Sequence, residues 1–226
     1  MNLFILSWDF KECAEYMFDK HVSKILLEAV QMLCTTIQIV DPENEINTRV
    51  QLYKIAHKNH PVTIWMRQSL ENYLWTLNLV DAMHDEWKFR YDHPEEKMHK
   101  SYVVAKYLRE YAPSADKFPS VGLTTFALAM PPECKREDPI ESYRIYYQTS
   151  EKQKIASWKK REKPAWYQCR DTLVPFDDVQ SVAAQTTRRP PKGADASARL
   201  RRIAESASFK IKIKIKIKVP QNGPII

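Results

Sequence analysis

The chain has 226 residues and a mass of 26.6 kDa, a length typical of one domain or of one domain with an appendage. Hydrophobic residues make up 44% and charged residues 28%, which is enough apolar material for a core and excludes a chain that is disordered throughout. Only three glycines occur, against roughly 16 at average usage. Glycine loops that cradle phosphates are therefore excluded, and a helical fold is favoured over a sheet.

The charges are unevenly distributed along the chain. Residues 1–168 contain 23 Lys and Arg against 23 Asp and Glu, whereas residues 169–226 contain 12 against 5 and carry the whole formal net charge of +7. All Trp, Tyr and His residues also precede position 168. We therefore expect a helical globular domain over 1–168 and a basic low-complexity tail over 169–226.

The cysteine spacing and the lengths of the apolar segments indicate where in the cell the protein is located. The four cysteines form no CxxC pair, and their spacings match no zinc ribbon or finger. The apolar start is short for a secretory leader, and no apolar run approaches the ~18–20 residues of a membrane span. These features predict a cytoplasmic protein that is not associated with a membrane.

Two long helices dominate the first half of the chain. Residues 3–7 form a short apolar run, either a small strand or a buried leader. The segment Asp9-Phe10-Lys11-Glu12 is typical of a capping box and opens a helix predicted over 10–40. A second long helix is predicted over 62–91, with Pro61 at its first position.

Shorter helices are predicted after the second long one. His93-Pro94 leads into a helix that reaches about Tyr111. Asp138-Pro139-Ile140-Glu141 has the signature of a helix cap and opens a short helix over 141–148, and a further helix covers 151–160. We therefore predict an all-α domain built on the two long helices, with any strand confined to its ends.

The tail has a different composition. Residues 186–198 are rich in Arg, Pro and Ala, which predicts disorder. Residues 210–219 alternate Lys with Ile, so a strand here would carry Ile on one face and Lys on the other. Such a ribbon could pair with a sheet edge or lie on a polyanion. Equally, it could be low-complexity sequence without an evolved role.

The first long helix has an apolar face made of Val22, Ile25, Leu26, Ala29, Leu33 and Ile37, and a polar stripe runs beside it. The stripe contains His21, Lys24, Glu28, Gln31 and Thr35. One interpretation is a solvated face with a Lys24–Glu28 pair. The other is the wall of a cleft, in which His21 and Glu28 move protons and Lys24 binds an anionic substrate.

Four polar residues of the second long helix lie on its aromatic, inward side: Gln68, Asn72, Glu86 and Arg90. Because buried charges are paired, Glu86 and Arg90 either satisfy each other at i,i+4 or line a pocket. In a pocket, Glu86 would move protons, Arg90 would neutralise charge and Asn72 would contact the substrate.

The segment His57-Lys58-Asn59-His60-Pro61 precedes this helix and is a candidate phosphate site. Free amides at a helix N-terminus attract anions, and His57, Lys58 and His60 would add donors. The two histidines could also provide two metal ligands, but the sequence does not assign a metal site or a cofactor.

Two further histidines precede or begin the third helix. The pair His84-Asp85 is typical of metal phosphohydrolases of the His-Asp type, but both residues project to the solvated side of the second helix on a helical wheel, so the pair is not assigned to a site. His99, early in the third helix, can fold back toward the end of the second and is the next candidate catalytic residue.

These residues also carry a resemblance. The chain resembles an uncharacterised family of small helical proteins from tailed phages and large DNA viruses, over about residues 1–167. The resemblance implies a compact helical domain, a viral or phage origin and a location inside the host cell, but no activity. It rests on Asp19-Lys20-His21, His57-Lys58-Asn59-His60-Pro61, Asn72-Tyr73-x-Trp75, Glu86 to Arg90-Tyr91, His99-Lys100, Gly122 to Pro131 and Trp158 to Arg161.

Two hypotheses of function follow. In the first, the protein acts on or binds nucleic acid or a nucleotide through the His/Lys/Arg/Glu cluster, with Arg90 and Glu86 within reach of His57 or His60. In the second, it is an interaction protein or a virion-associated protein that is not an enzyme, and the same polar residues are structural. The sequence does not decide between an enzyme and a binding protein.

Overall fold

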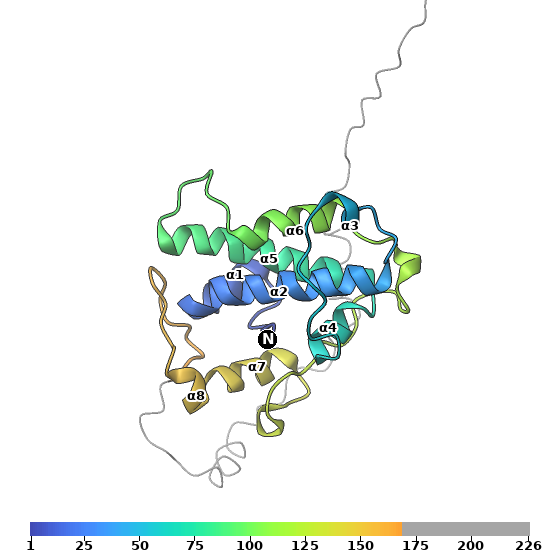
Figure 1. Ribbon diagram of the computed structural model, residues 1–226. Helices are drawn as coiled ribbons and strands as arrows, with labels where there is room; N and C mark the ends of the chain where they lie inside the picture. Colours follow the sequence, from blue (N-terminus) through green and yellow to red (C-terminus); the bar gives the residue numbers. More distant parts are fainter. Residues whose placement is uncertain (169–226) are drawn as a thin grey trace, which may run out of the picture. The chain divides into compact units, whose positions relative to one another are not determined.

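Helices account for all the regular structure in residues 1–168, the part of the chain that the computed structural model describes (Figure 1). The all-α prediction is confirmed for these residues, among which no strand occurs. The predictions for 186–198 and 210–219 lie outside the described residues. The elements are α1 (Phe10–Tyr16), α2 (Asp19–Val40), α3 (Ile46–Arg49), α4 (Pro61–Met66), α5 (Leu70–Tyr91), α6 (Lys100–Glu110), the 3-10 turns η1 (Ala115–Lys117) and η2 (Pro132–Cys134), α7 (Pro139–Tyr147) and α8 (Ser150–Gln153).

The helix predicted over 10–40 is interrupted, and α1 and α2 take its place. The capping role of Asp9 is confirmed, since its carboxylate accepts a hydrogen bond from the Glu12 amide at 2.8 Å. The backbone is extended at Met17 (φ −69°, ψ 146°), the C-cap of α1, and at Phe18 (φ −61°, ψ 151°), the N-cap of α2, and this separates the two helices. The Phe18 ring is fully buried and stacks on Tyr147, with centroids 4.3 Å apart. Burial of this ring stabilises a break that neither proline nor glycine marks in the sequence.

The helix predicted over 62–91 is also divided, into α4 and α5. Pro61 begins α4 as predicted. Ser69 then caps α5, and its hydroxyl accepts a hydrogen bond from the Asn72 amide at 3.1 Å. A serine side chain that bonds the backbone in this way favours a new helix start over continuation of the old helix.

The shorter helices differ from prediction at their ends. α6 begins at Lys100, behind the cap residue His99, rather than directly after Pro94. α7 begins at Pro139, two residues before the predicted start, and Asp138 caps it. α8 ends at Gln153, so most of the segment predicted as helix up to residue 160 is not helical.

α2 is the central helix of the described residues. It packs against α4, α5 and α6, and α7 lies on the side of α2 away from α5 and α6 (Figure 1). The predicted apolar face is confirmed, because all of its residues are buried: Val22, Ile25, Leu26, Ala29, Leu33 and Ile37. The core therefore lies around α2, as the apolar periodicity indicated.

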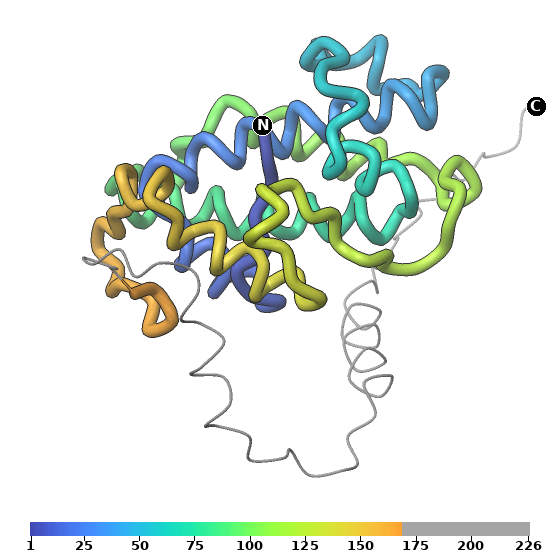
Figure 2. The backbone as a smooth tube through the Cα atoms, turned by 90° about the horizontal axis from the view of Figure 1, so that it is seen from below, coloured from blue at the N-terminus to red at the C-terminus, as the bar shows by residue number. Residues whose placement is uncertain are grey.

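Residues 1–7 form a buried leader rather than a strand, and pass through the middle of the domain (Figure 2). Residues 3–6 are at most 1% exposed. Phe4 packs between His21 of α2 and Tyr147 of α7, at centroid distances of 4.9 and 5.0 Å. Buried backbone groups here bond side chains instead of a sheet neighbour: the carbonyl of Leu6 accepts from Arg144 at 2.9 Å.

α2 also has the length and apolar composition of a possible membrane-spanning helix, and no other helix among residues 1–168 does. Other parts of the protein bury 61% of its most apolar window. A core helix passes the same test, so these two properties do not by themselves assign a membrane span.

Candidate anion-binding site

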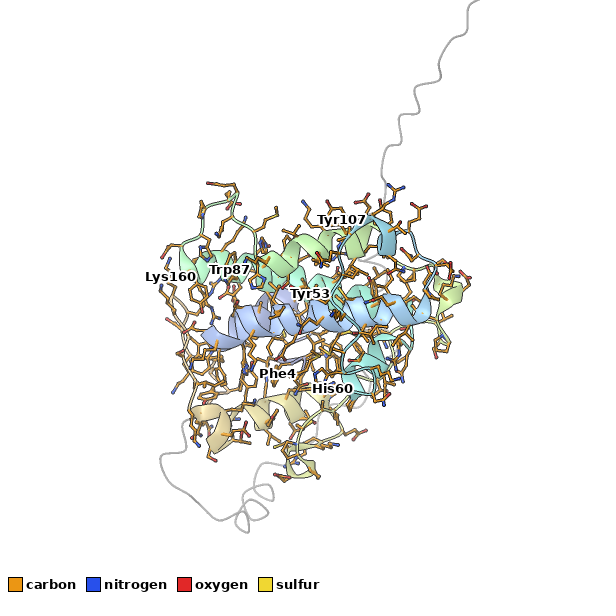
Figure 3. The ribbon with its side chains drawn as sticks, in the orientation of Figure 1. Phe4, Tyr53, His60, Trp87, Tyr107 and Lys160 are labelled. Carbon is orange, nitrogen blue, oxygen red and sulfur yellow. The ribbon has the colours of Figure 1, made fainter. Side chains whose placement is uncertain are left out.

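The polar stripe of α2 forms one wall of a cavity of about 230 Å³, here called the α2–α7 cavity. His21, Lys24 and Glu28 line it from successive turns of α2. The opposite wall contains Tyr146 of α7 and Lys152 of α8. Phe4 of the leader also lines it and lies between α2 and α7 in Figure 3. The placement of His21, Lys24 and Glu28 therefore agrees with the interpretation of the stripe as the wall of a polar cleft.

His21 is held as a neutral donor in this cavity. Its Nδ1 lies 2.6 Å from the Tyr147 hydroxyl, and its side chain is 4% exposed. Burial, reinforced by the charges of Lys152 and Lys24, lowers the pKa of His21 to about 3. Burial also raises the pKa of Tyr147 well above its ordinary value, so the phenol keeps its proton at neutral pH. We assign that proton to the bond with Nδ1, which leaves the ring proton on Nε2.

Glu28 is already occupied by donors. Its Oε2 accepts a hydrogen bond from the Asn2 amide at 2.8 Å and lies 3.9 Å from the amino group of Met1. Its Oε1 lies 3.9 Å from Lys24 Nζ, so the predicted i,i+4 pair is confirmed. Lys24 is 70% exposed, and its ammonium group can therefore turn toward a ligand at the mouth of the cavity.

His60 lies at this end of the molecule and caps α4 (Figure 3). Its Nδ1 accepts a hydrogen bond from the Val62 amide at 3.3 Å. Burial lowers the pKa of His60, the charges of the Met1 amine and His57 lower it further, and Glu28 opposes them. His57 and Lys58 are exposed, and His57 has a positive φ of 50°. The structure therefore brings His60 near Glu28, but His57 and Lys58 contribute no wall to the cavity.

Lys152 is a site residue that the sequence analysis missed. Its Nζ lies 4.8 Å from the centroid of the Tyr146 ring and 5.6 Å from that of Phe4. No carboxylate of residues 1–168 lies within ion-pair distance of this group. Burial lowers the pKa of Lys152, Lys24 adds to this effect, and Glu151 and Glu28 oppose it. No local pattern distinguishes this lysine from its neighbours in the charged segment 150–160.

Glu86 and Arg90 pair with each other in a structural ion cluster, and neither lines the α2–α7 cavity. Arg90 is 0% exposed, and all five of its N–H groups have partners. They bond to Glu86 at 2.5 Å, to Asp19 at 3.0 Å and to the carbonyls of Met17 at 2.7 Å, Glu15 at 2.8 Å and Ala14 at 3.4 Å. The guanidinium therefore ties the end of α5 to the junction of α1 and α2.

The carboxylate of Glu86 is equally saturated. It accepts hydrogen bonds from Arg90 and, at 2.7 Å, from Arg161. Burial would raise the pKa of Glu86, but the bonds from Arg161 and Arg90 lower it overall. The prediction that Arg90 and Glu86 reach His57 or His60 is wrong. Arg90 bonds Asp19, nine residues before Glu28 on α2, which places the cluster about 13 Å along the helix from the site at Glu28.

Asn72 is likewise bonded within the protein. Its amide nitrogen donates to the Trp65 carbonyl at 2.7 Å and to the Thr124 hydroxyl at 2.6 Å, and its oxygen accepts from the Thr124 amide at 3.0 Å. The side chain therefore joins the turn between α4 and α5 to the loop around residue 124. No group of Asn72 is left for a substrate.

His99 lies on another side of α2 from the cavity. Its Nδ1 accepts from the Ser101 amide at 3.3 Å, which caps α6, and its Nε2 lies 3.1 Å from the Ser23 hydroxyl. Burial lowers the pKa of His99. With both ring nitrogens engaged, His99 joins α6 to α2 and does not share a site with His21.

The sequence interpretation of His84 is wrong, although Asp85 is exposed as expected. His84 is 3% exposed and stacks on Tyr102, with centroids 3.7 Å apart and planes 7° apart. A buried histidine can occur on a polar stripe when a neighbouring helix covers it, and α6 does so here. Among the described residues, no group of three or more His, Cys, Asp or Glu side chains could hold a metal ion.

A second, wider cavity of about 630 Å³ lies between α1 and α5. Phe10, Ala82 and Phe89 form its apolar part, and Glu86 and Arg161, which bond each other, form one side. The charged residues that line it are Asp9, Lys11, Asp85, Glu86 and Arg161, which sum to a net negative charge. This leaves the α2–α7 cavity as the better site for an anionic ligand.

Comparisons with known proteins give no relative: no protein-family model, curated protein or solved structure matches the chain. The resemblance to phage and viral proteins stays a prediction.

Proposed function

We propose that the protein binds a phosphate-bearing ligand, a nucleotide or the end of a nucleic acid, with the anionic group in the α2–α7 cavity. One observation carries this proposal. The cavity has two lysines, Lys24 and Lys152, against a single carboxylate, Glu28, which accepts a hydrogen bond from the Asn2 amide and lies 3.9 Å from Lys24. An anion between the two ammonium groups would compensate the excess positive charge.

The neutral state of His21 supports the same ligand. With Tyr147 on Nδ1, the Nε2–H of His21 is a fixed donor for an anion oxygen. A cavity of about 230 Å³ is smaller than the roughly 300–1,000 Å³ of pockets that enclose drug-sized ligands. It therefore suits a phosphate group, while the remainder of a nucleotide would extend beyond the mouth.

Binding is better supported than catalysis. Of the four side chains considered as catalytic, Glu86 and His99 lie outside the cavity, and Glu28 is occupied by donors. The second hypothesis, a structural role for the polar residues, accounts for Asn72, Glu86 and Arg90. It does not account for the unpaired Lys152.

The proposal is tested by calorimetric titration with inorganic phosphate, adenosine monophosphate and adenosine. We expect phosphate and the monophosphate to bind and adenosine to bind at least tenfold more weakly. Lys152→Met should weaken phosphate binding about tenfold or more, since a hydrogen bond to a charged group contributes about 1.5–3 kcal/mol.

Lys154→Met is the matched control, because Lys154 is exposed and lies two residues away without lining the cavity. It should leave the phosphate affinity unchanged. Adenosine binding as tightly as the monophosphate, or no phosphate binding at all, would overturn the proposal.

A further inference from the structure

We propose that Glu28 selects the ligand of the α2–α7 cavity by hydrogen bonding, so that the site takes a phosphate group that carries one proton and rejects sulfate and phosphodiesters. The inference rests on the proposed function and deepens it. It names the class of ligand, which is inorganic phosphate or a phosphomonoester in its singly protonated form.

The two oxygens of Glu28, the one carboxylate among the described residues that line the cavity, differ in their contacts. Oε2 accepts a hydrogen bond from the Asn2 amide at 2.8 Å and lies 3.9 Å from the amino group of Met1, so it faces the leader. Oε1 lies 3.9 Å from Lys24 Nζ, a distance at which the charges attract but which is too long for a hydrogen bond. Although donors surround Glu28, Oε1 therefore keeps its lone pairs for a donor of the ligand.

Other groups of the cavity provide donors for the remaining ligand oxygens. These are the ammonium groups of Lys24 and Lys152 and the Nε2–H of His21. Monohydrogen phosphate has oxygens that accept and one hydroxyl that donates, whereas sulfate has only oxygens that accept and carries no proton at neutral pH. A cavity with several donors and one carboxylate acceptor therefore matches protonated phosphate in its hydrogen-bonding groups.

Sulfate has nearly the same shape as monohydrogen phosphate and the same charge, but it would place an unprotonated oxygen against Oε1 of Glu28. The side chain of Glu28 is only 13% exposed, so water can separate the two negative oxygens only in part. A site built to hydrogen-bond a hydroxyl of its ligand rejects an analogue that lacks this hydroxyl, because the buried acceptor stays unpaired. Glu28 is therefore a specificity-determining residue, whereas the lysines provide the affinity.

The same reasoning separates a terminal phosphate from the internal backbone of a nucleic acid. A phosphomonoester has a second pKa of about 6 and can carry one proton near neutral pH. A phosphodiester has no proton to donate to Oε1. The ligand is therefore inorganic phosphate or a group that ends in phosphate.

The test compares phosphate, sulfate and dimethyl phosphate by calorimetric titration of the full chain at neutral pH and constant ionic strength. We expect phosphate to bind about tenfold or more tightly than either of the others, because only phosphate gains a hydrogen bond to a charged group at Oε1. This comparison needs no variant, so it decides the question even if substitution of Glu28 prevents folding.

Glu28→Gln should reverse the preference. The glutamine oxygen can still accept from the Asn2 amide, which puts the NH2 donor in the place of Oε1. Phosphate should then bind more weakly, and sulfate should bind more tightly, than to the unsubstituted protein.

Glu151→Gln is the matched control. Glu151 is exposed and precedes Lys152 without lining the cavity, so the substitution removes a nearby negative charge but no acceptor of the site. It should change the affinities for phosphate and sulfate by the same factor and leave their ratio unchanged.

The outcomes separate this inference from the proposed function. Sulfate or dimethyl phosphate that binds as tightly as phosphate would overturn the role of Glu28 and leave the anion site standing. A phosphate-to-sulfate ratio that a folded Glu28→Gln variant leaves unchanged would do the same. Binding of none of the three anions would overturn the anion site itself, and this inference with it.

Discussion

The guanidinium of Arg90 donates a 2.7 Å hydrogen bond to the backbone carbonyl of Met17, 73 residues earlier in the chain. Met17 is the C-cap residue of α1, where carbonyls are left without helical partners. The guanidinium at the end of α5 therefore provides a hydrogen-bond donor for a backbone carbonyl at the break between α1 and α2. This contact explains why a fully buried arginine occurs in a helix that otherwise packs with aromatic residues.

Arg90→Met is expected to destabilise the protein strongly. The substitution would remove the side-chain donor from the Met17 carbonyl and leave Glu86 with Arg161 as its only cation, and breaking a buried ion pair typically costs about 3–5 kcal/mol. The measurement is the free energy of unfolding from urea titration followed by circular dichroism.

Arg109→Met is the matched control for this experiment. Arg109 bonds Asp81 at 2.6 Å, but both side chains are about 40% exposed. Exposed ion pairs contribute about 0–1 kcal/mol, so the control should lose less than about 1 kcal/mol. Equal losses for the two variants would contradict a structural role for Arg90.

Asn72→Leu is expected to destabilise the protein by about 1–3 kcal/mol. The apolar side chain would leave the Thr124 amide without its partner, and one unsatisfied buried group costs about 1–3 kcal/mol. The Trp65 carbonyl would lose one of two bonds and keep the Gln68 amide at 3.0 Å. Hydrogen exchange should quicken first around residue 124. Asn78→Leu, at a half-buried position on the same helix, is the control, and a similar loss there would argue against a specific role for Asn72.

His84 should make the protein less stable as the pH falls. Burial, with Lys88 and His99 adding to it, lowers the pKa of His84 from 6.5 to about 4. Between these two pH values the unfolded chain binds the proton and the folded protein does not, so the free energy of unfolding decreases on acidification, by up to about 1.4 kcal/mol per pH unit. The contribution of neutral His84 to the free energy of unfolding is complete above pH 6.5 and is lost progressively toward pH 4.

His84→Phe removes this titration while keeping a ring on Tyr102. Its free energy of unfolding should fall less steeply between pH 6.5 and 4 than that of the unsubstituted protein. At pH 7 it should be at least as stable, because Nε2 of His84 is buried without a hydrogen-bond partner. Parallel pH profiles for the two proteins would contradict this account.

Nonspecific nucleic-acid binding should be a property of the basic tail. Residues 1–168 have balanced charges, whereas residues 169–226 contain 12 basic and 5 acidic residues. Affinity of this kind falls with salt according to the number of phosphates neutralised. Truncation after residue 168 should therefore abolish most of the binding measured by fluorescence anisotropy at low salt. A truncated protein that binds as tightly, with the same salt dependence, would instead place the nucleic-acid surface on the helical domain.

Local patterns were sufficient for the fold class and for several element boundaries. The apolar spacing from Val22 to Ile37 predicted which face of α2 is buried, and the caps at Asp9 and Asp138 were found where their sequence signals stand. These features depend on residues within one or two turns of each other, so a single segment contains the information. Ser69 is also a local signal, because serine is a preferred N-cap residue, but the helix predicted over 62–91 ran through it.

Only the tertiary structure decided the break between α1 and α2 at Phe18. It also decided that the residues predicted to form one His/Lys/Arg/Glu cluster lie in separate parts of the domain. The helical wheel indicated that Glu86 and Arg90 face inward, but the partners of Arg90 other than Glu86 come from the α1 junction, more than 70 residues away. His21 acquires its tautomer from Tyr147, 126 residues later, and Lys152 becomes a site residue because α8 lies beside the leader. A polar stripe specifies which way a side chain points, whereas its chemistry is set by the segment that packs against it, and packing between distant segments leaves no local pattern.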